Sequence, residues 1–171
     1  MPNLFVMRHG DAASSAAGDR SRVLSPLGQA QALETGRLLA GLPEPPRQIL
    51  CSAAPRALET ARLVATALAD SSASPLGGTA GSEELPFRAE DDLYLAPAQA
   101  MLEAAANALA SNPADLLVVA HEPGCGELIS LLCDGQPDLV SYPYRTAGVR
   151  RLELPSPGVL LPGSARLTLE L

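Results

Sequence analysis

The chain has 171 residues, a length that corresponds to one domain and is sufficient to bury a hydrophobic core. Its net charge is −7 and all twelve basic residues are arginine, so no basic stripe favours a nucleic-acid or anionic-membrane partner. Three cysteines without a CxxC pair disfavour a disulfide scaffold or a zinc ribbon. No apolar run is long enough for a membrane span, and no charged leader precedes the first apolar run. We therefore expect one reduced, cytoplasmic domain over residues 1–171.

The charge is spread unevenly along the chain. The first 62 residues hold seven arginines and five acidic residues, whereas the rest of the chain holds five arginines and fourteen acidic residues. The N-terminal third is therefore locally basic, which is compatible with a small anionic ligand.

Hydrophobic patterning predicts alternating strands and helices. Ser25-Pro26 is typical of a helix start, and Gly41 is typical of a helix end. Residues 71–82, SSASPLGGTAGS, have the composition of a flexible loop. The alternation predicts an α/β fold, a three-layer sandwich in which helices flank a mostly parallel central sheet. In chain order, the predicted elements are a strand over 4–7, a helix over 27–42, a strand over 48–51, a helix from Pro55 to the loop, a helix over about 97–111, a strand over 116–120, a helix over about 124–132, and strands over 149–154 and 165–171.

The chain contains only two histidines, and each follows an apolar strand. His9 lies two residues after Met7, and His121 comes directly after Ala120. In open α/β sheets, ligands bind beyond the carboxyl ends of the strands, so both histidines are expected at the ligand-binding edge. One histidine at such a place would carry little information, but two at equivalent strand ends indicate a functional site.

Arginine and glycine residues accompany these histidines. Arg8 offers a fork of donors suited to phosphate oxygens, and Gly10 lets a ligand approach the backbone closely. Arg56 begins the helix after the second predicted strand, where the helix N-terminus favours anions. Taken alone, Arg56 would be interpreted as a surface residue paired with Glu59 or Glu90. Together these groups predict an anion-binding pocket.

Four segments, in order along nearly the whole chain, resemble motifs of the histidine phosphatase superfamily. Arg8-His9-Gly10 is similar to its signature, and residues 24–28, LSPLG, resemble its Leu-Thr-x-x-Gly helix start. Residues 51–61, CSAAPRALETA, resemble its Ser-Ser-Pro-x-x-Arg-Ala-x-x-Thr-Ala segment. Residues 118–123, VVAHEP, resemble the strand end that carries its second histidine. The short length, the Asp-Ala after Arg-His-Gly and the His-Glu-Pro are similar to the small SixA-type branch of bacterial phosphohistidine phosphatases.

The resemblance implies a phosphoglycerate mutase-like fold and a two-step phosphatase mechanism without a metal or other cofactor. His9 would attack phosphorus and become phosphohistidine, which water then cleaves. For this His9 must be neutral, so its other ring nitrogen needs an acceptor, either a backbone carbonyl near Gly10 or a loop side chain. The implied substrate is phosphohistidine on a signalling protein, or a small phosphoester, and we expect a monomer. The residues implied to hold the phosphoryl oxygens are Arg8, Arg22 (with Arg20 as a near neighbour), Arg56 and His121.

The chain departs from the family pattern at three places. Ala53 stands where the family has proline, residues 71–82 form an insertion, and the general acid is not evident. Larger members place a glutamate in a segment that resembles Glu90-Asp91-Asp92. We predict that Asp91 or Asp92 is the acid, without separating the two, and interpret Glu90 as part of a solvated turn.

Other functions are less consistent with the sequence. A cysteine-based phosphatase needs five residues between its cysteine and arginine, whereas four separate Cys51 from Arg56. A mutase would need insertions that so short a chain lacks, and a non-catalytic reader of phosphohistidine would not need the nucleophile. A metallohydrolase is the remaining alternative, but no known metal motif joins its possible ligands, which are His9, Asp11, His121 and Glu122.

Overall fold

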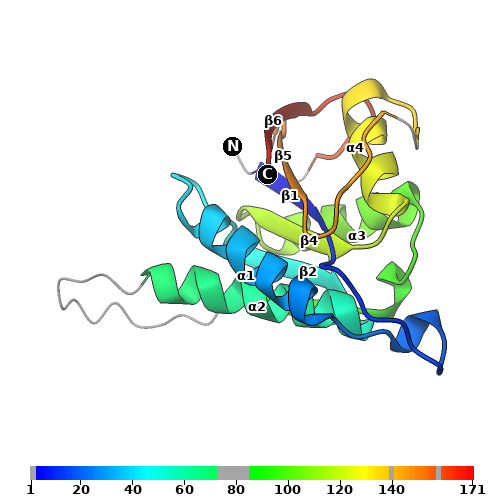
Figure 1. The fold of residues 1–171 in the computed structure, drawn as a ribbon. Coiled ribbons are helices and arrows are strands. Elements are labelled where there is room, and N and C mark those ends of the chain that lie inside the picture. The colour runs from blue at the N-terminus through cyan, green and yellow to red at the C-terminus, as the bar shows by residue number, and fades with distance from the viewer. Residues whose placement is uncertain (1–2, 73–84, 139–140, 157–158) are drawn as a thin grey trace.

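A six-stranded sheet forms the centre of the molecule (Figure 1). The computed structural model describes residues 3–72, 85–138, 141–156 and 159–171. The strand order is β3-β2-β4-β1-β5-β6, in which β1 to β4 run parallel and β5 and β6 are antiparallel to their neighbours. The strands are β1 (Asn3–Arg8), β2 (Gln48–Ser52), β3 (Phe87–Glu90), β4 (Leu116–Ala120), β5 (Val149–Glu153) and β6 (Arg166–Glu170).

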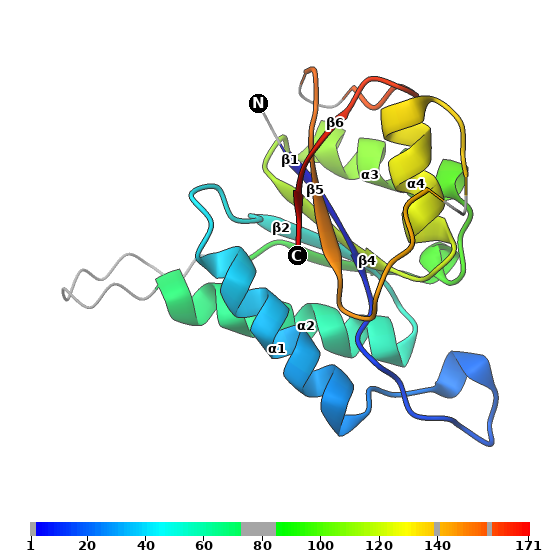
Figure 2. The same ribbon diagram turned by 45° about the horizontal axis from the view of Figure 1, so that its top comes forward.

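Two pairs of helices cover the two faces of this sheet. Figure 2 shows α1 and α2 side by side on one face, with α3 and α4 on the other. The expected three-layer α/β architecture with a mostly parallel sheet is therefore confirmed. Within the described residues, no helix combines the length and apolar character needed to cross a membrane. The helices are α1 (Pro26–Ala40), α2 (Pro55–Ser72), α3 (Ala98–Ser111) and α4 (Gly124–Asp134), with short 3₁₀ helices η1 (Asp19–Ser21) and η2 (Asp91–Leu93).

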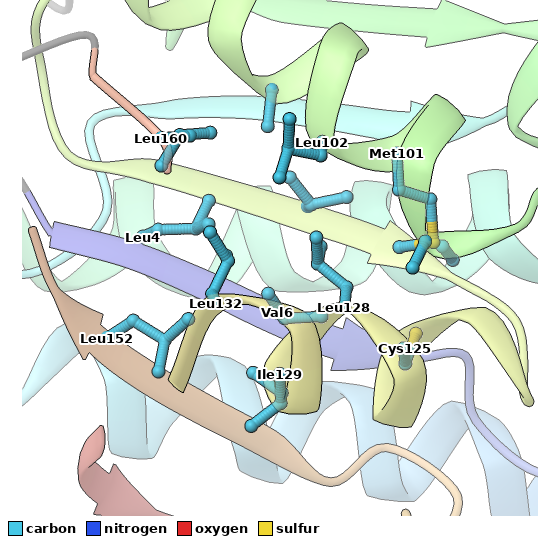
Figure 3. Close-up of a cluster of buried hydrophobic side chains, with 14 of the residues drawn as sticks. Leu4, Val6, Met101, Leu102, Cys125, Leu128, Ile129, Leu132, Leu152 and Leu160 are labelled. Carbon is cyan, nitrogen blue, oxygen red and sulfur yellow. The ribbon is translucent and has the colours of Figure 1, made fainter. Parts of the chain in front are cut away.

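Each face of the sheet carries its own hydrophobic core, because successive side chains of a strand point to opposite faces. In β1, Phe5 and Met7 pack with residues of α1 and α2. Leu4 and Val6 pack with residues of α3 and α4, as the close-up in Figure 3 shows. All four side chains are fully buried. This double burial is why the strands read as continuous apolar runs in the sequence.

The helix boundaries follow the capping residues. The Ser25 side chain accepts a hydrogen bond from the backbone N–H of Gly28, and Pro26 is the first residue of α1, as the sequence predicts. Helix α4 runs two residues further than expected, to Asp134, because Gly135 adopts the left-handed conformation that ends it. Helix α2 likewise includes residues 71 and 72, which we expected in the loop. Residues 73–82 of that predicted loop lie outside the described residues.

Strand β3 was not expected from the sequence. It is four residues long, lies at the edge of the sheet, and pairs in parallel with β2. Its residues are Phe-Arg-Ala-Glu, all of them half-buried or exposed, so it lacks the apolar run that marks the central strands. Pairing with β2 determines its position, and the local sequence pattern does not indicate this pairing.

The parallel strands bring both histidines to one edge of the sheet. Arg8 and Ala120 are register partners at the carboxyl ends of β1 and β4, so His9 and His121 leave the sheet next to each other. The backbone N–H of His9 donates to the carbonyl oxygen of Ala120 at 3.0 Å. The neighbouring strand β2 ends at Ser52, on the side of β4 away from β1.

Candidate active site

A pocket of about 280 Å³ lies at this carboxyl edge. It brings together five of the predicted site residues, namely Arg8, His9, Arg22, Arg56 and His121. The other residues that line it are Asp11, Ala12, Asp19, Leu95, Glu122 and Thr146.

Hydrogen bonds to both ring nitrogens fix the tautomer of His9. Its Nδ1 lies 2.7 Å from the carbonyl oxygen of Gly10. A carbonyl can only accept, so the proton sits on Nδ1 and the lone pair on Nε2. Of the two acceptors left open by the sequence, the backbone carbonyl is therefore the one used. The Nε of Arg56 donates to Nε2 of His9 at 3.2 Å.

The surroundings keep His9 neutral. Burial lowers the pKa of His9 to about 4, and the positive charges of Arg56, Arg8 and Arg22 act in the same direction. The hydrogen bond to the Gly10 carbonyl opposes this shift. At neutral pH the ring is therefore uncharged, which is the form that can attack.

Thr60 of α2 connects the His9 loop to Arg56. Its Oγ1 accepts from the backbone N–H of Gly10 at 3.0 Å and donates to the carbonyl oxygen of Arg56 at 2.7 Å. On the other side of the loop, a Cβ on Gly10 would lie 2.6 Å from the carbonyl oxygen of Gly28. The loop is thus fixed between α1 and α2.

Arg56 is a buried residue of the pocket, only 2% exposed. Its Nη1 donates to the backbone carbonyl of Asp19 at 2.7 Å, and its Nη2 pairs with the Asp19 carboxylate at 2.8 Å. The interpretation of Arg56 as a surface residue paired with Glu59 or Glu90 is therefore wrong.

The carboxylate of Asp19 joins three donors at the mouth of the pocket. Besides Arg56, it accepts from Nη1 of Arg22 at 3.2 Å and from the hydroxyl of Tyr94 at 2.7 Å. The Tyr94 hydrogen bond, followed by those from Arg22 and Arg56, lowers the pKa of Asp19 to about 2. Asp19 is consequently ionised throughout the neutral range.

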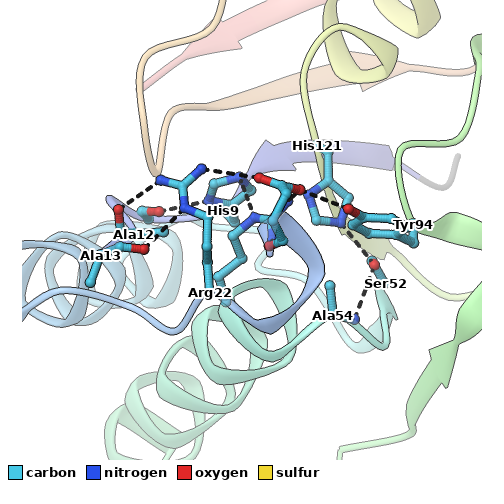
Figure 4. Close-up of polar contacts among 11 residues, drawn as sticks. His9, Ala12, Ala13, Arg22, Ser52, Ala54, Tyr94 and His121 are labelled. Carbon is cyan, nitrogen blue, oxygen red and sulfur yellow. Dashed lines mark hydrogen bonds and ion pairs between the residues drawn. The ribbon is translucent and has the colours of Figure 1, made fainter. Parts of the chain in front are cut away.

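Backbone carbonyls hold the two remaining arginines. Arg8 donates from Nη1 to the carbonyl of Tyr144 at 2.8 Å, while its buried Nε has no partner among the described residues. Arg22 donates to the carbonyls of Ala12 at 2.7 Å and Ala13 at 3.0 Å, as Figure 4 shows. Arg20 does not line the pocket; its guanidinium lies over the ring of Tyr94 and pairs with Asp91.

His121 is 2% exposed and completes the wall of the pocket. Its ring centroid lies 5.2 Å from that of His9 and 5.4 Å from that of Tyr94, which it meets edge-on. Its Nε2 lies 2.8 Å from the hydroxyl oxygen of Ser52. Burial lowers the pKa of His121 to about 3, and the positive charge of Arg56 acts in the same direction.

Asp91 and Asp92 do not line the pocket. They lie in η2, both exposed, and Asp91 forms an ion pair with Arg20. The structure therefore does not bring the two candidates for the general acid together with His9. The carboxylates that line the pocket are those of Asp11, Asp19 and Glu122.

Neither a cysteine nor a metal cluster accompanies the pocket in the described ranges. Cys51 is fully buried, does not line the pocket, and has its pKa raised to about 12 by burial. Within those ranges, no group of three or more His, Cys, Asp or Glu side chains is arranged to hold a metal ion.

Four further residues belong to this site and were not singled out from the sequence. Ser52 and Thr60 lie inside the 51–61 segment that resembles the family motif, so their positions were a usable signal. Asp19 and Tyr94 lie 75 residues apart and meet only through the fold. No local pattern indicates such a contact.

Comparison with known proteins agrees with this geometry. A search of curated protein sequences finds no match, whereas the model of the histidine phosphatase superfamily (branch 1) matches residues 4–76. The protein histidine phosphatase SixA complexed with tungstate has a TM-score of 0.75 at 23% identity, covering 99% of this chain and 96% of that chain. A mycobacterial glucosyl-3-phosphoglycerate phosphatase with VO3 has a TM-score of 0.73 at 16% identity, covering 99% and 98%. YhfR of Bacillus stearothermophilus has a TM-score of 0.71 at 19% identity, covering 99% and 96%.

The two kinds of comparison are complementary. At such identities the solved structures establish the fold, which is the expected phosphoglycerate mutase-like one. The family model covers the segment that contains Arg8, His9, Arg22 and Arg56. The chain is thus similar in sequence to the histidine phosphatase superfamily over residues 4–76, and its fold is that of the solved structures above.

Proposed function

We propose that the chain is a phosphatase that acts through His9 on phosphohistidine carried by a signalling protein, without a metal ion. Nε2 of His9 attacks phosphorus as the bond from phosphorus to the substrate's imidazole nitrogen breaks, and the leaving imidazole takes up a proton. Water then attacks the phosphohistidine at His9, which releases inorganic phosphate and restores the ring. The lone pair on Nε2, fixed by the Nδ1 contact to Gly10, supports this role.

The charged groups of the pocket suit the demands of phosphoryl transfer. That reaction depends mainly on positioning and on neutralising the charge of the phosphoryl oxygens. Arg8, Arg22 and Arg56 are permanently charged, and His121 borders the same pocket. Each arginine is held by at least one backbone carbonyl, so little reorganisation is needed when an oxyanion binds.

The observation that carries the choice of substrate is that every carboxylate lining the pocket is engaged as an acceptor. Asp11 accepts from the Ser25 hydroxyl, and Asp19 accepts from two arginines and a tyrosine. The two oxygens of Glu122 accept from the backbone N–H groups of Gly126 at 3.0 Å and Tyr144 at 2.7 Å. Both carboxylate oxygens of Asp19 and of Glu122 are thus occupied by donors, as is one oxygen of Asp11.

This arrangement favours a phosphoramidate over an alkyl phosphate. A leaving alkoxide is a strong base and has to be protonated as its bond to phosphorus breaks. The imidazole of phosphohistidine is a better leaving group and can gain its proton before cleavage. The names of two structural neighbours, a protein histidine phosphatase and a glucosyl-3-phosphoglycerate phosphatase, represent these two substrate classes.

A comparison of substrates tests the proposal. We expect the protein to dephosphorylate a phosphohistidine protein far faster than alkyl phosphates, with activity retained in a chelator. A brief pulse of labelled substrate should trap acid-labile, base-stable phosphate on His9, and His9→Ala should abolish turnover. Label on another residue, or full activity of His9→Ala, would overturn the mechanism.

The same assay decides the role of Asp91 and Asp92. If either one donates a proton, Asp91→Asn or Asp92→Asn should impair alkyl phosphate hydrolysis much more than phosphohistidine hydrolysis. Their exposed positions outside the pocket lead us to expect that both variants retain most of their activity on phosphohistidine.

A further inference from the structure

The two ring nitrogens of His121 have different surroundings. Nε2 lies 2.8 Å from the Ser52 hydroxyl oxygen, whereas Nδ1 is buried and has no partner among the described residues. Buried polar atoms of native proteins nearly always have a partner, so an orphaned nitrogen in the wall of a pocket points to a ligand. What it can bind depends on which nitrogen carries the proton.

The Ser52 hydroxyl determines the position of that proton. Ser52 is fully buried, and its Oγ already accepts a hydrogen bond from the backbone N–H of Ala54 at 3.2 Å. Its own hydrogen has one acceptor within reach in the described part of the chain, which is Nε2 of His121. If Ser52 donates there, the proton of the neutral ring is on Nδ1, and that N–H is the one group left unpaired.

The opposite arrangement leaves more groups unpaired. If Nε2 carried the proton and donated to Ser52, the hydroxyl hydrogen and the Nδ1 lone pair would both be buried without partners. Each unmet polar group costs about 1–3 kcal/mol. The arrangement with Ser52 as the donor is therefore favoured.

We propose that Ser52 is a positioning residue, which by donating to Nε2 keeps the proton of His121 on Nδ1, where it serves as a hydrogen-bond donor to a phosphoryl oxygen. Figure 4 shows the ring of His121 with Ser52 on one side and His9 on the other. The two histidines then have the same tautomer but opposite tasks. In His9 the Nδ1 proton is used by Gly10 and the Nε2 lone pair attacks; in His121 the lone pair is used by Ser52 and the Nδ1 proton binds. The choice of ligand rests on the proposed function, whereas the tautomer does not.

The presence of only two histidines makes the tautomer directly measurable. In ¹⁵N-labelled protein at neutral pH, long-range ¹H–¹⁵N spectra contain two imidazole spin systems, and His9→Gln assigns them. We expect His121 to show a protonated Nδ1 and an unprotonated Nε2. In Ser52→Ala the Nε2 partner is lost, so the signals should shift towards a mixture of tautomers.

Binding of tungstate provides the second measurement. Ser52→Ala should weaken tungstate binding by about tenfold or more, the loss expected for one hydrogen bond to a charged group. Ser130→Ala is the matched control, because Ser130 is also buried but donates to the carbonyl of Gln136 at 2.7 Å and does not line the pocket. It should change neither the spectrum nor the tungstate affinity.

The two measurements separate this inference from the proposed function. A protonated Nε2 on His121 in the native protein would overturn the inference even if the protein is an active phosphatase. An unchanged His121 spectrum in Ser52→Ala would overturn the role of Ser52. If tungstate fails to bind while the tautomer is as expected and shifts in Ser52→Ala, the oxyanion is the wrong ligand and the proposed function fails, but Ser52 keeps its positioning role.

Discussion

Asp19 accepts hydrogen bonds from donors that a bound phosphate would use. Its carboxylate accepts from Arg22 and Arg56, two of the residues expected to hold phosphoryl oxygens. With a pKa lowered to about 2, it carries a negative charge at every pH at which the protein would be assayed. An incoming oxyanion therefore has to compete with a carboxylate that belongs to the protein itself.

This competition leads to a prediction for Asp19→Asn. Removing the charge should tighten tungstate binding by about three- to tenfold, since a half-exposed charge pair contributes on the order of 1 kcal/mol. Isothermal titration calorimetry measures the change, and Asp92→Asn, which removes an equal charge outside the pocket, should bind like the native protein. Weaker binding by Asp19→Asn would show instead that the carboxylate is needed to hold the arginines in place.

The two neutral histidines make stability depend on pH. Burial lowers the pKa of His9 to about 4 and that of His121 to about 3, whereas both are near 6.5 in the unfolded chain. Between these values the unfolded state binds more protons, so acidification favours unfolding. The free energy of unfolding should fall by up to about 1.4 kcal/mol per pH unit for each histidine as the pH drops from about 6.5 towards 4.

Urea denaturation at several pH values checks this dependence. Comparing the native protein with His9→Gln isolates the contribution of His9 from that of the many carboxylates. The variant should lose stability less steeply on acidification. Equal slopes would mean that His9 has the same pKa in the folded and the unfolded protein, so that burial does not hold it neutral on acidification.

At the scale of elements, the local sequence pattern predicts the strands that are buried on both faces of the sheet, because such strands are continuous apolar runs. The strand over Leu116–Ala120 has the bounds that its apolar run indicates, and α1 begins at the predicted Pro26. Strand β3 escapes prediction because it is short, at an edge and half-polar. The same distinction holds in the pocket. Residues next to strand ends could be found from the sequence, whereas the contact of Asp19 with Tyr94 depends on how two 3₁₀ helices meet in space.

The contact between α1 and the His9 loop is a further element-scale feature, and it leads to a prediction. A Cβ on Gly28 would lie 1.9 Å from the carbonyl oxygen of Asp11, so the helix and the loop meet backbone to backbone. Gly28→Ala should therefore destabilise the protein by about 1–3 kcal/mol and reduce turnover, because the loop has to move.

Thermal denaturation and a turnover assay test this, with Gly41→Ala as the control on the same helix. A Cβ on Gly41 would come no closer than 3.6 Å to its neighbours, and its φ of −79° suits alanine. The control should keep its activity and be as stable as the native protein or slightly more so. A tolerated Gly28→Ala would mean that the His9 loop does not depend on this contact.

At the scale of the whole molecule, the order of the strands in the sheet differs from their order in the chain. Strands β1 and β2 lead directly to His9 and to the turn before Arg56, yet they do not pair with each other. Each pairs with β4 (Leu116–Ala120), which comes much later in the chain and ends directly before His121. A chain that stops before residue 116 should therefore fail to bind tungstate, even though it contains Arg8, His9, Arg22 and Arg56. Tungstate binding by such a fragment would show that the site forms without β4.

The central position of β4 also bears on when the pocket forms during synthesis. While the N-terminal part emerges, β1 and β2 have no strand between them, so the pocket has no wall on the side of His121. Pairing of β4 with β1 and β2 brings together residues that are far apart in the sequence. It is slow because the long intervening loops must close. The pocket should thus become complete in one late step, when β4 inserts and closes the central sheet, rather than on the folding of any single segment.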